Sequence, residues 1–171
     1  MKQLLDTMTT SIKYYTKRIC FQEIPDEISF TYFLTNCPNK CKNCHSPHLR
    51  EDIGTTVGSS LSSDLEKHKD ICSCVLFMGG DDDRQIDSLA FNLAHCKLKG
   101  FKTALYSGFD LEHAPADLLY LLDYIKVGPY IEHLGGLKEK TTNQRLYKIV
   151  DGKITEDITS MFWRKLDENQ S

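Results

Sequence analysis

The sequence predicts an α/β fold with mostly parallel strands, and three observations support this prediction. Between residues 28 and 127, short apolar runs typical of strands alternate with segments in which apolar residues recur at helical spacing. Glycine or proline closes several of these runs, as at Gly79-Gly80 and Gly128-Pro129. The length of 171 residues fits one domain better than two. Strands that alternate with helices form parallel sheets through right-handed crossovers.

Four strands are predicted in the core of the chain. The first is rich in β-branched and aromatic residues, and the others are short apolar runs. They are expected at residues 28–34, 75–78, 101–106 and 124–127. A polar loop at residues 37–58 separates the first strand from the next predicted element. Loops of this length are usually functional or disordered, so this loop is a candidate site.

Three helices are predicted between these strands. Ser63-Asp64-Leu65-Glu66 has the spacing of a capping box, so a short helix is expected to begin there. Apolar residues recur at helical spacing from Ile86 to Ala94, and Gly100 supplies a stop. Pro115 is expected to open a third helix, whose apolar residues are Leu118, Leu119, Leu121 and Leu122.

The chain is expected to form a single domain with an N-terminal extension, a core, and a C-terminal hairpin and tail, at about residues 1–27, 28–150 and 151–171. Asp151-Gly152 is a strong signal for a two-residue hairpin turn between residues 145–150 and 153–158. The residues from Asp167 on are polar and are expected to fray.

Composition and charge exclude several classes of protein. The formal net charge is -3, which disfavours nucleic-acid binding because such proteins usually carry a basic face. No stretch approaches the ~18 consecutive apolar residues of a membrane span. The first 20 residues lack the apolar centre of a signal peptide. We therefore expect a cytoplasmic protein without a membrane partner, in which thiols stay reduced.

Seven cysteines are more than a reduced chain of this size needs for folding. Cys37, Cys41 and Cys44 form a C-x3-C-x2-C pattern directly after the first predicted strand. Three thiolates on one loop suit three corners of a cubane iron–sulfur cluster, whose fourth iron is then open to chelate a small molecule. Spacing alone leaves two alternatives, a zinc site completed by His45 or His48, and cysteines without a metal. The remaining cysteines, among them Cys72, Cys74 and Cys96, are expected to be ordinary residues.

Gly79-Gly80-Asp81 follows another predicted strand. Sites in parallel α/β folds form beyond the carboxyl ends of the strands, where the cysteine pattern also lies. Two glycines let the backbone approach a ligand closely, and an aspartate accepts hydrogen bonds from an ammonium group. An ordinary loop is the alternative at this position.

Together these motifs resemble those of the radical S-adenosylmethionine (SAM) superfamily. The cysteine pattern is similar to that superfamily's cluster motif, and Gly79-Gly80-Asp81 resembles its element that contacts the methionyl amino group of SAM. Cys44-His45-Ser46-Pro47 and Tyr106-Ser107-Gly108 resemble segments of glycyl-radical activating enzymes. Thr142-Asn143-Gln144-Arg145 resembles a segment of the activating proteins of anaerobic ribonucleoside-triphosphate reductase. The resemblance covers roughly residues 19–149.

This resemblance implies a partial, open radical-SAM β/α barrel and an oxidoreductase chemistry. The three cysteines would hold a [4Fe–4S] cluster, and one electron would split SAM into methionine and a 5′-deoxyadenosyl radical. That radical would remove a hydrogen atom from a glycine of the partner reductase, leaving a glycyl radical there. A low-potential electron donor such as flavodoxin is the second expected partner. The implied cofactor-binding residues are Gly79, Gly80, Asp81, His45, Ser107 and Lys126.

Two other functions stay open at this point. The first is a radical SAM enzyme that acts on a small molecule or a peptide. The second is a zinc or iron–sulfur module without enzymatic activity. Lys126 lies at a predicted strand end, where a solvated lysine is the alternative to a SAM contact, and His45 has a plain loop role as its alternative. No catalytic side chain is expected beyond the cluster and SAM.

Overall fold

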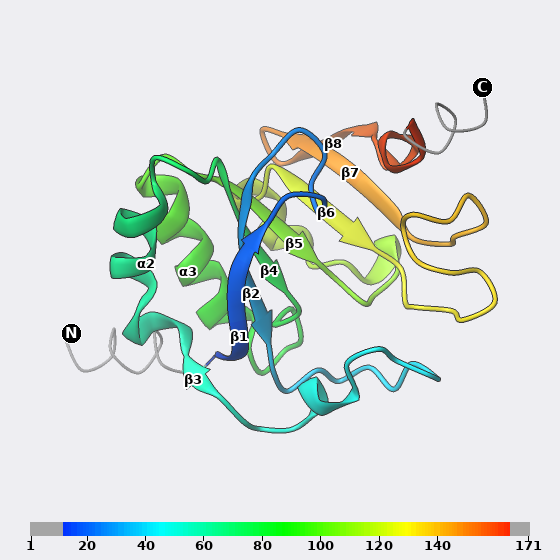
Figure 1. The fold of residues 1–171 in the computed structure, drawn as a ribbon, viewed down its shortest axis with the longest axis horizontal. Coiled ribbons are helices and arrows are strands. Elements are labelled where there is room, and N and C mark those ends of the chain that lie inside the picture. Colours follow the sequence, from blue (N-terminus) through cyan, green and yellow to red (C-terminus); the bar gives the residue numbers. More distant parts are fainter. Residues whose placement is uncertain (1–11, 165–171) are drawn as a thin grey trace.

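The computed structural model describes residues 12–164 and places them around one open, eight-stranded sheet (Figure 1). The strands follow the order β3-β1-β2-β4-β5-β6-β7-β8 across the sheet. Their bounds are β1 Lys13–Cys20, β2 Ser29–Leu34, β3 Thr55–Thr56, β4 Cys74–Met78, β5 Lys102–Tyr106, β6 Tyr124–Val127, β7 Arg145–Val150 and β8 Lys153–Asp157.

Parallel pairing is confined to the centre of the sheet. The strands β2, β4, β5 and β6 pair in parallel, while β1 and β7 join the two sides of this group as antiparallel strands. Therefore the expectation of mostly parallel strands describes the central four only. Because these four strands run in one direction, their carboxyl ends meet at one edge of the sheet, where ligand sites form in parallel α/β folds.

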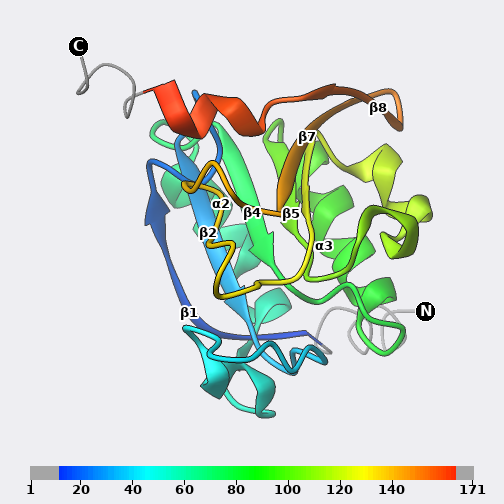
Figure 2. The same ribbon diagram turned by 90° about the vertical axis from the view of Figure 1, so that its right-hand side faces the viewer.

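Helices cover one face of the sheet. Within residues 12–164, the α-helices α2 Leu61–His68 and α3 Ile86–Leu98 lie on the same side of it (Figures 1 and 2). Short 3-10 helices occupy the connections, namely η1 Pro47–Arg50, η2 Val57–Ser59, η3 Leu111–His113 and η4 Ala116–Leu121, and η5 Thr159–Trp163 follows β8.

Alternate residues of the central strands divide between two apolar clusters. Val75 and Phe77 of β4 pack in the larger cluster, with the apolar residues of α2 and α3. Leu76 points to the other face and packs in a second cluster that includes Leu137. Met161 of η5 packs against this second cluster. Figure 2 shows the segment between β6 and β7 passing in front of this second face.

Most elements predicted from the sequence are confirmed. The four core strands correspond to β2, β4, β5 and β6, and α3 begins at Ile86 as expected. Gly100 follows α3 with a φ of 86°, the left-handed conformation expected of a glycine stop. Asp151 and Gly152 both have positive φ, as a type I′ hairpin turn between β7 and β8 requires.

The expectation that residues 1–27 are an extension of the core is wrong for β1. This strand pairs with β2 along most of its length. The sequence of β1 does not show a clear alternation of polar and apolar residues, because Lys13, Lys17 and Arg18 interrupt the apolar residues. The Lys17 ammonium lies 5.0 Å from the ring centroid of Tyr14, so a charged side chain is part of the packing here.

Two helix predictions are also corrected. The helix α2 begins at Leu61, two residues before the predicted capping box, and Ser63 donates its hydroxyl back to the Ser60 carbonyl at 2.9 Å. The segment after Pro115 is the 3-10 helix η4 rather than an α-helix, and Pro115 precedes its first turn. The polar tail expected from Asp167 on lies outside the described residues.

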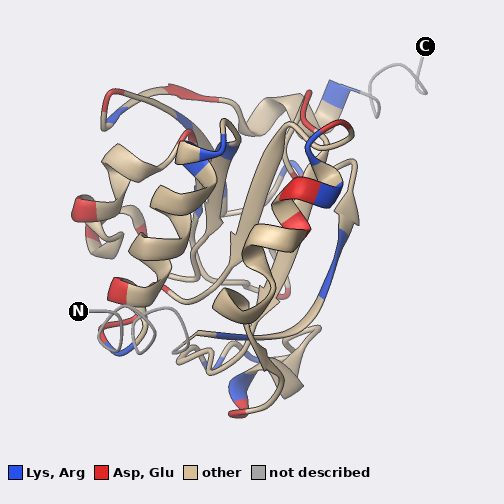
Figure 3. Ribbon diagram, turned by 90° about the vertical axis from the view of Figure 1, so that its left-hand side faces the viewer, with Lys and Arg blue, Asp and Glu red and all other residues tan. Residues whose placement is uncertain are grey.

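Charges of both signs are interspersed along the chain on the side seen in Figure 3. This distribution agrees with a net charge of only -3. None of the helices within residues 12–164 combines the length and the apolar character needed to cross a membrane.

A polar cluster ties β1 and β2 to α2. The buried carboxylate of Asp64 accepts hydrogen bonds from Lys17 Nζ at 2.6 Å, Tyr32 Oη at 2.6 Å and Ser60 Oγ at 2.9 Å. Burial by itself would raise the pKa of Asp64, but these three donors outweigh it and lower the pKa below its usual value. The ionised carboxylate is therefore the form that stabilises the fold.

Replacing Asp64 with Asn is expected to lower the free energy of unfolding by about 2 kcal/mol at neutral pH, because Lys17 loses its charged partner. Since folding lowers the pKa of Asp64, its contribution is present above an unfolded pKa of about 4 and is lost as the pH falls through the folded pKa. Urea titrations near neutral pH and at about pH 3 should therefore show a smaller pH-dependent loss for the variant than for the wild type. Equal losses would contradict this role of Asp64.

Candidate iron–sulfur site

The loops that follow the four parallel strands form the candidate site. The cysteine loop, residues 36–52, follows β2 and lies beyond the ends of β2 and β4 in Figure 1. Gly79-Gly80-Asp81 follows β4, Ser107 follows β5, and Gly128 follows β6. The sequence therefore brings four separate segments to one edge of the sheet through the parallel pairing of its central strands.

Backbone hydrogen bonds close the cysteine loop at its base. The Asn36 amide donates to the Glu51 carbonyl at 3.2 Å, and the Cys37 amide donates to the Leu49 carbonyl at 2.9 Å. Asn36 has a φ of 61°, a left-handed conformation that asparagine tolerates better than most residues. The first cysteine is thus fixed at the point where the chain leaves β2.

Arg50 organises the interior of the loop. Its Nε donates to the Asn39 carbonyl at 3.1 Å and its guanidinium donates a second bond to the Cys41 carbonyl at 2.8 Å. The amide of Ser46 donates to Cys44 Sγ at 3.4 Å. These contacts set the backbone around Cys41 and Cys44, and nothing in the spacing of the sequence points to Arg50.

The three thiols are half-buried and lie within electrostatic reach of one another. Burial raises the pKa of Cys37, and the neighbouring Cys41, Cys44 and Asp81 raise it further. A bound cation or cluster has the opposite influence, because thiolate ligands are deprotonated when they bind metal. The loop therefore concentrates potential negative charge that a positively charged iron centre would offset.

Within residues 12–164, no group of three or more His, Cys, Asp or Glu side chains is arranged to hold a metal ion. Four ligands at ~2.3 Å from one zinc ion lie within ~4 Å of one another, whereas a cubane cluster takes each thiolate on a separate iron. The donor set of three thiols on one loop fits such a cluster in number and in ligand type.

Gly79 and Gly80 shape the next loop, with φ values of 94° and 85° that other residues rarely adopt. A Cβ at Gly80 would lie 2.6 Å from Cδ1 of Leu34 in β2. Asp81, the next residue, is 8% exposed. No hydrogen bond to Asp81 Oδ2 forms within the described part of the chain. Burial raises the pKa of Asp81, against the lowering influence of Ser107 and Lys126.

Lys126 places a buried cation at the same edge. It is 8% exposed, and its Nζ donates to the carbonyls of Ser107 at 3.1 Å and Gly128 at 2.9 Å. Burial lowers its pKa to about 8, while Cys41, Asp81 and Cys37 act in the opposite direction. The alternative of a solvated lysine is therefore wrong.

His45 and Ser107 have contacts of their own. The ring of His45 lies 4.9 Å from that of Tyr130, measured between centroids. Ser107 Oγ accepts a hydrogen bond from the Phe109 amide at 3.0 Å. A Cβ at Gly108 would lie 2.0 Å from Nδ2 of Asn39, so the cysteine loop packs directly on the turn after β5.

The segment between β6 and β7 also reaches the cysteine loop. Asn43 Nδ2 donates to Glu132 Oε2 at 2.6 Å, and this contact joins residues far apart in the sequence. Gln144 is buried and its Nε2 donates to the Gly128 carbonyl at 3.4 Å. Arg145 bonds nearby carbonyls and lies 3.8 Å from Asp157, so its observed role is structural.

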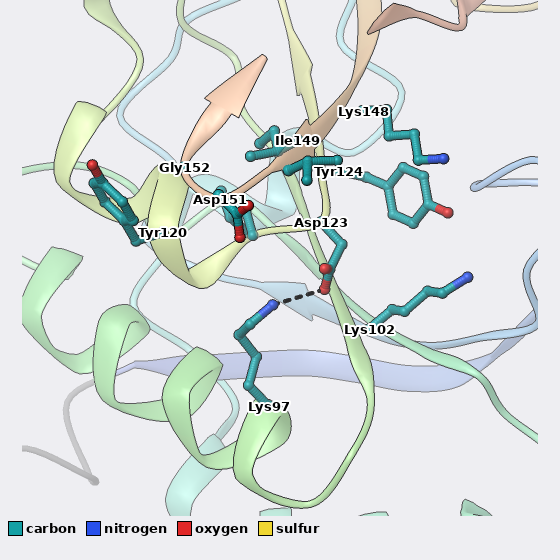
Figure 4. Close-up of a pocket in the computed structure, with 11 residues that line it drawn as sticks. Lys97, Lys102, Tyr120, Asp123, Tyr124, Lys148, Ile149, Asp151 and Gly152 are labelled. Atoms are coloured by element: carbon teal, nitrogen blue, oxygen red, sulfur yellow. Dashed lines mark hydrogen bonds and ion pairs between the residues drawn. The ribbon is translucent and has the colours of Figure 1, made fainter. Parts of the chain in front are cut away.

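Other features lie away from this edge. The four remaining cysteines are buried, and they are Cys20, Cys72, Cys74 and Cys96. A cavity of about 490 Å³ lies at the opposite edge of the sheet, lined by Lys97, Asp123 and the Asp151-Gly152 turn among others (Figure 4). The Lys97 ammonium forms a 3.0 Å ion pair with Asp123 there. This cavity does not include the sequence-predicted site residues.

Replacing Arg50 with Ala is expected to release iron from the reconstituted protein about tenfold faster when a chelator is added, because the carbonyls of Asn39 and Cys41 lose their donor. Lys40 is an exposed cation of the same loop, so Lys40→Ala is the matched control for the loss of charge. Release is followed by the visible absorbance of the cluster. Equal rates for the two variants would show that Arg50 does not support the loop.

A comparison with known protein families matches residues 28–150, most of the chain, to the 4Fe-4S single cluster domain. Neither curated proteins nor solved structures gave a match. The matched range contains the cysteine loop and all the loops at its edge of the sheet. It favours an iron–sulfur cluster over the zinc alternative, in agreement with the three-thiol donor set. On this match the chain belongs to the 4Fe-4S single cluster domain family.

Proposed function

We propose that this protein is a radical SAM activase. In this proposal the open sheet is a partial radical-SAM barrel, and Cys37, Cys41 and Cys44 hold the [4Fe–4S] cluster. The protein cleaves SAM reductively and generates a glycyl radical on a partner anaerobic ribonucleotide reductase. The observation that carries the proposal is the buried carboxylate oxygen Oδ2 of Asp81, which has no hydrogen-bond donor within residues 12–164, at the same edge as the buried cation of Lys126.

These two charges complement the methionyl end of SAM. An α-amino acid carries an ammonium group, which supplies the donors that Asp81 Oδ2 lacks, and a carboxylate, which suits a cation such as Lys126. At Gly79 the nearest atom to a Cβ would be 3.9 Å away, which leaves space for a ligand beside the backbone, whereas Leu34 fills the corresponding space at Gly80. A buried carboxylate oxygen without a donor is costly in the free protein, so a cationic ligand that donates to Asp81 Oδ2 would bind there favourably.

The strands supply an apolar wall next to these charges. Phe33, Met78 and Tyr106 are neighbours in the register of β2, β4 and β5, and Tyr106 is the neighbour of Lys126 in β6. The Lys126 ammonium lies 5.8 Å from the Tyr106 ring centroid. Such a wall would exclude water from a reactive intermediate. When bound, the cluster would supply the electron that breaks a carbon–sulfur bond of SAM.

The open sheet supports a macromolecular substrate. The strands β3 and β8 are its outer strands, and β8 is exposed along its length. A sheet that does not close leaves room for a loop of a second protein. The reductase, a low-potential donor such as flavodoxin and a cytoplasmic location are parts of this proposal.

The proposal is tested by electron paramagnetic resonance on an added anaerobic ribonucleotide reductase. The reduced, cluster-loaded protein and SAM are expected to produce a glycyl-radical doublet on the reductase. Cleavage of SAM without this doublet would favour the alternative of a small-molecule or peptide substrate. A loaded cluster without SAM binding would favour an iron–sulfur module that is not an enzyme.

A further inference from the structure

The Gly79-Gly80-Asp81 loop and the cysteine loop are joined by a polar link that the proposed chemistry does not use. The link consists of Asp82, Arg84 and Gln85, which directly precede α3, and the backbone carbonyl of Asn36. We infer that Asp82 and Gln85 are positioning residues, which hold the SAM-binding loop and the first cluster cysteine at a fixed spacing. This inference rests on the proposed function.

Gln85 makes the central contacts of this link. Its side chain is 5% exposed, and Nε2 donates to Asp82 Oδ2 at 2.6 Å and to the Asn36 carbonyl at 3.3 Å. Both partners are acceptors, so the orientation of the amide is defined by its contacts. One buried amide group therefore spans the loop after β4 and the residue before Cys37.

Asp82 and Arg84 complete the link. Asp82 Oδ1 accepts hydrogen bonds from the Arg84 amide and from Arg84 Nε, both at 3.0 Å. The guanidinium of Arg84 donates to the Asn36 carbonyl at 3.4 Å. Thus two side chains converge on the carbonyl of Asn36, and one buried carboxylate holds both of them.

Because the Asn36 carbonyl belongs to the residue that begins the cysteine loop, the link acts on the position of that loop. Asn36 is the residue at which the cysteine loop begins, and its amide closes the loop on Glu51. Asp82 directly follows Asp81, whose carboxylate carries the proposed contact with SAM. A shift at Asn36 relative to Asp82 would therefore change the spacing between the cluster and the methionyl group. Small displacements of this kind weaken reactions that depend on orientation.

A positioning role also explains why Gln85 is not ideal for stability. Its Oε1 is buried and has no hydrogen-bond partner within residues 12–164. A buried polar atom without a partner lowers stability, and an apolar residue of similar shape avoids that cost. The hydrogen bonds from Gln85 Nε2 to Asp82 and Asn36 therefore account for this amide better than a contribution to the stability of the fold does.

The test compares Gln85→Leu with Asn92→Leu. Asn92 is a matched control because it lies on α3, the helix that Gln85 precedes, and is fully buried. It donates Nδ2 to the Ser88 carbonyl at 2.7 Å, and its Oδ1 has no partner among the described residues. After anaerobic reconstitution, both variants are expected to keep the iron content and visible absorbance of the wild type. The dissociation constant for SAM, measured by equilibrium dialysis, is expected to rise about tenfold for Gln85→Leu only. The KM of Gln85→Leu for SAM should rise together with this dissociation constant, while kcat at saturating SAM changes less than KM.

A second measurement does not depend on SAM. Hydrogen exchange in the full-length protein without cluster should show faster exchange of the Asn36 and Cys37 amides in Gln85→Leu, and no change in Asn92→Leu. Unchanged exchange, or wild-type SAM affinity with a full cluster, would overturn the inference. A wild-type protein that carries the cluster and does not bind SAM would instead overturn the proposed function, and the exchange measurement would still decide whether Gln85 joins the loops.

Discussion

Cys41→Ala is expected to abolish cluster assembly and to reduce SAM cleavage to background. Three thiolates are the ligands that this chain offers to the cluster on its loop, and loss of one leaves two irons without a protein ligand. The same result is expected for Cys37→Ala and Cys44→Ala. Iron and sulfide content and the visible absorbance after anaerobic reconstitution measure the first effect, and methionine release measures the second.

Cys96→Ala is the control for this experiment. Cys96 is fully buried in the apolar cluster beside α3, so its replacement is expected to cost about 1 kcal/mol of stability without affecting iron content. A full cluster in the variants of Cys37, Cys41 and Cys44 would contradict the assignment of the ligands. Equal iron loss in Cys96→Ala would indicate that general unfolding causes the effect.

Asp81→Asn is expected to reduce kcat/KM for SAM cleavage about 100-fold, because a neutral amide replaces the carboxylate that we propose as the partner of the SAM amino group. The cluster is expected to remain, since Asp81 is not one of its ligands. The same substitution is expected to raise the free energy of unfolding of the protein without cofactors by about 1 kcal/mol. Burial raises the pKa of Asp81, so the ionised carboxylate opposes folding above that pKa, and an amide does not.

This combination separates a ligand contact from a structural role. Replacing a structural aspartate lowers the free energy of unfolding of the protein, whereas replacing a carboxylate kept for a ligand raises it. Thermal unfolding of the protein without cluster and steady-state cleavage assays of the loaded protein measure the two effects. Wild-type cleavage by Asp81→Asn would contradict the role of Asp81, and a large loss of stability would indicate a structural role.

The sequence predicts the central sheet well because the relevant signals are local. The strands β4, β5 and β6 are short apolar runs, and glycines or a proline mark several of their ends. The motifs Cys37 to Cys44 and Gly79-Gly80-Asp81 are also local, so the edge of the sheet that carries the candidate site could be predicted from them. The parallel pairing then explains why segments so far apart in the chain meet.

The parts that could not be predicted depend on contacts between distant residues. In β1, Lys17 forms an ion pair with Asp64 of α2, and no pattern within β1 indicates that partner. The bonds from Gln85 to Asn36 and from Asn43 to Glu132 join separate segments in the same way. The lack of a partner for Asp81 Oδ2 among residues 12–164 is likewise a property of the folded chain, because the sequence shows an aspartate but not its surroundings.

The most direct test of the central claim is the reaction of the anaerobically reconstituted, chemically reduced protein with SAM. We expect methionine and 5′-deoxyadenosine to form in equal amounts, and both to depend on the cluster, on the reductant and on Asp81. An iron–sulfur protein that binds no SAM and releases neither product under these conditions would contradict the central claim.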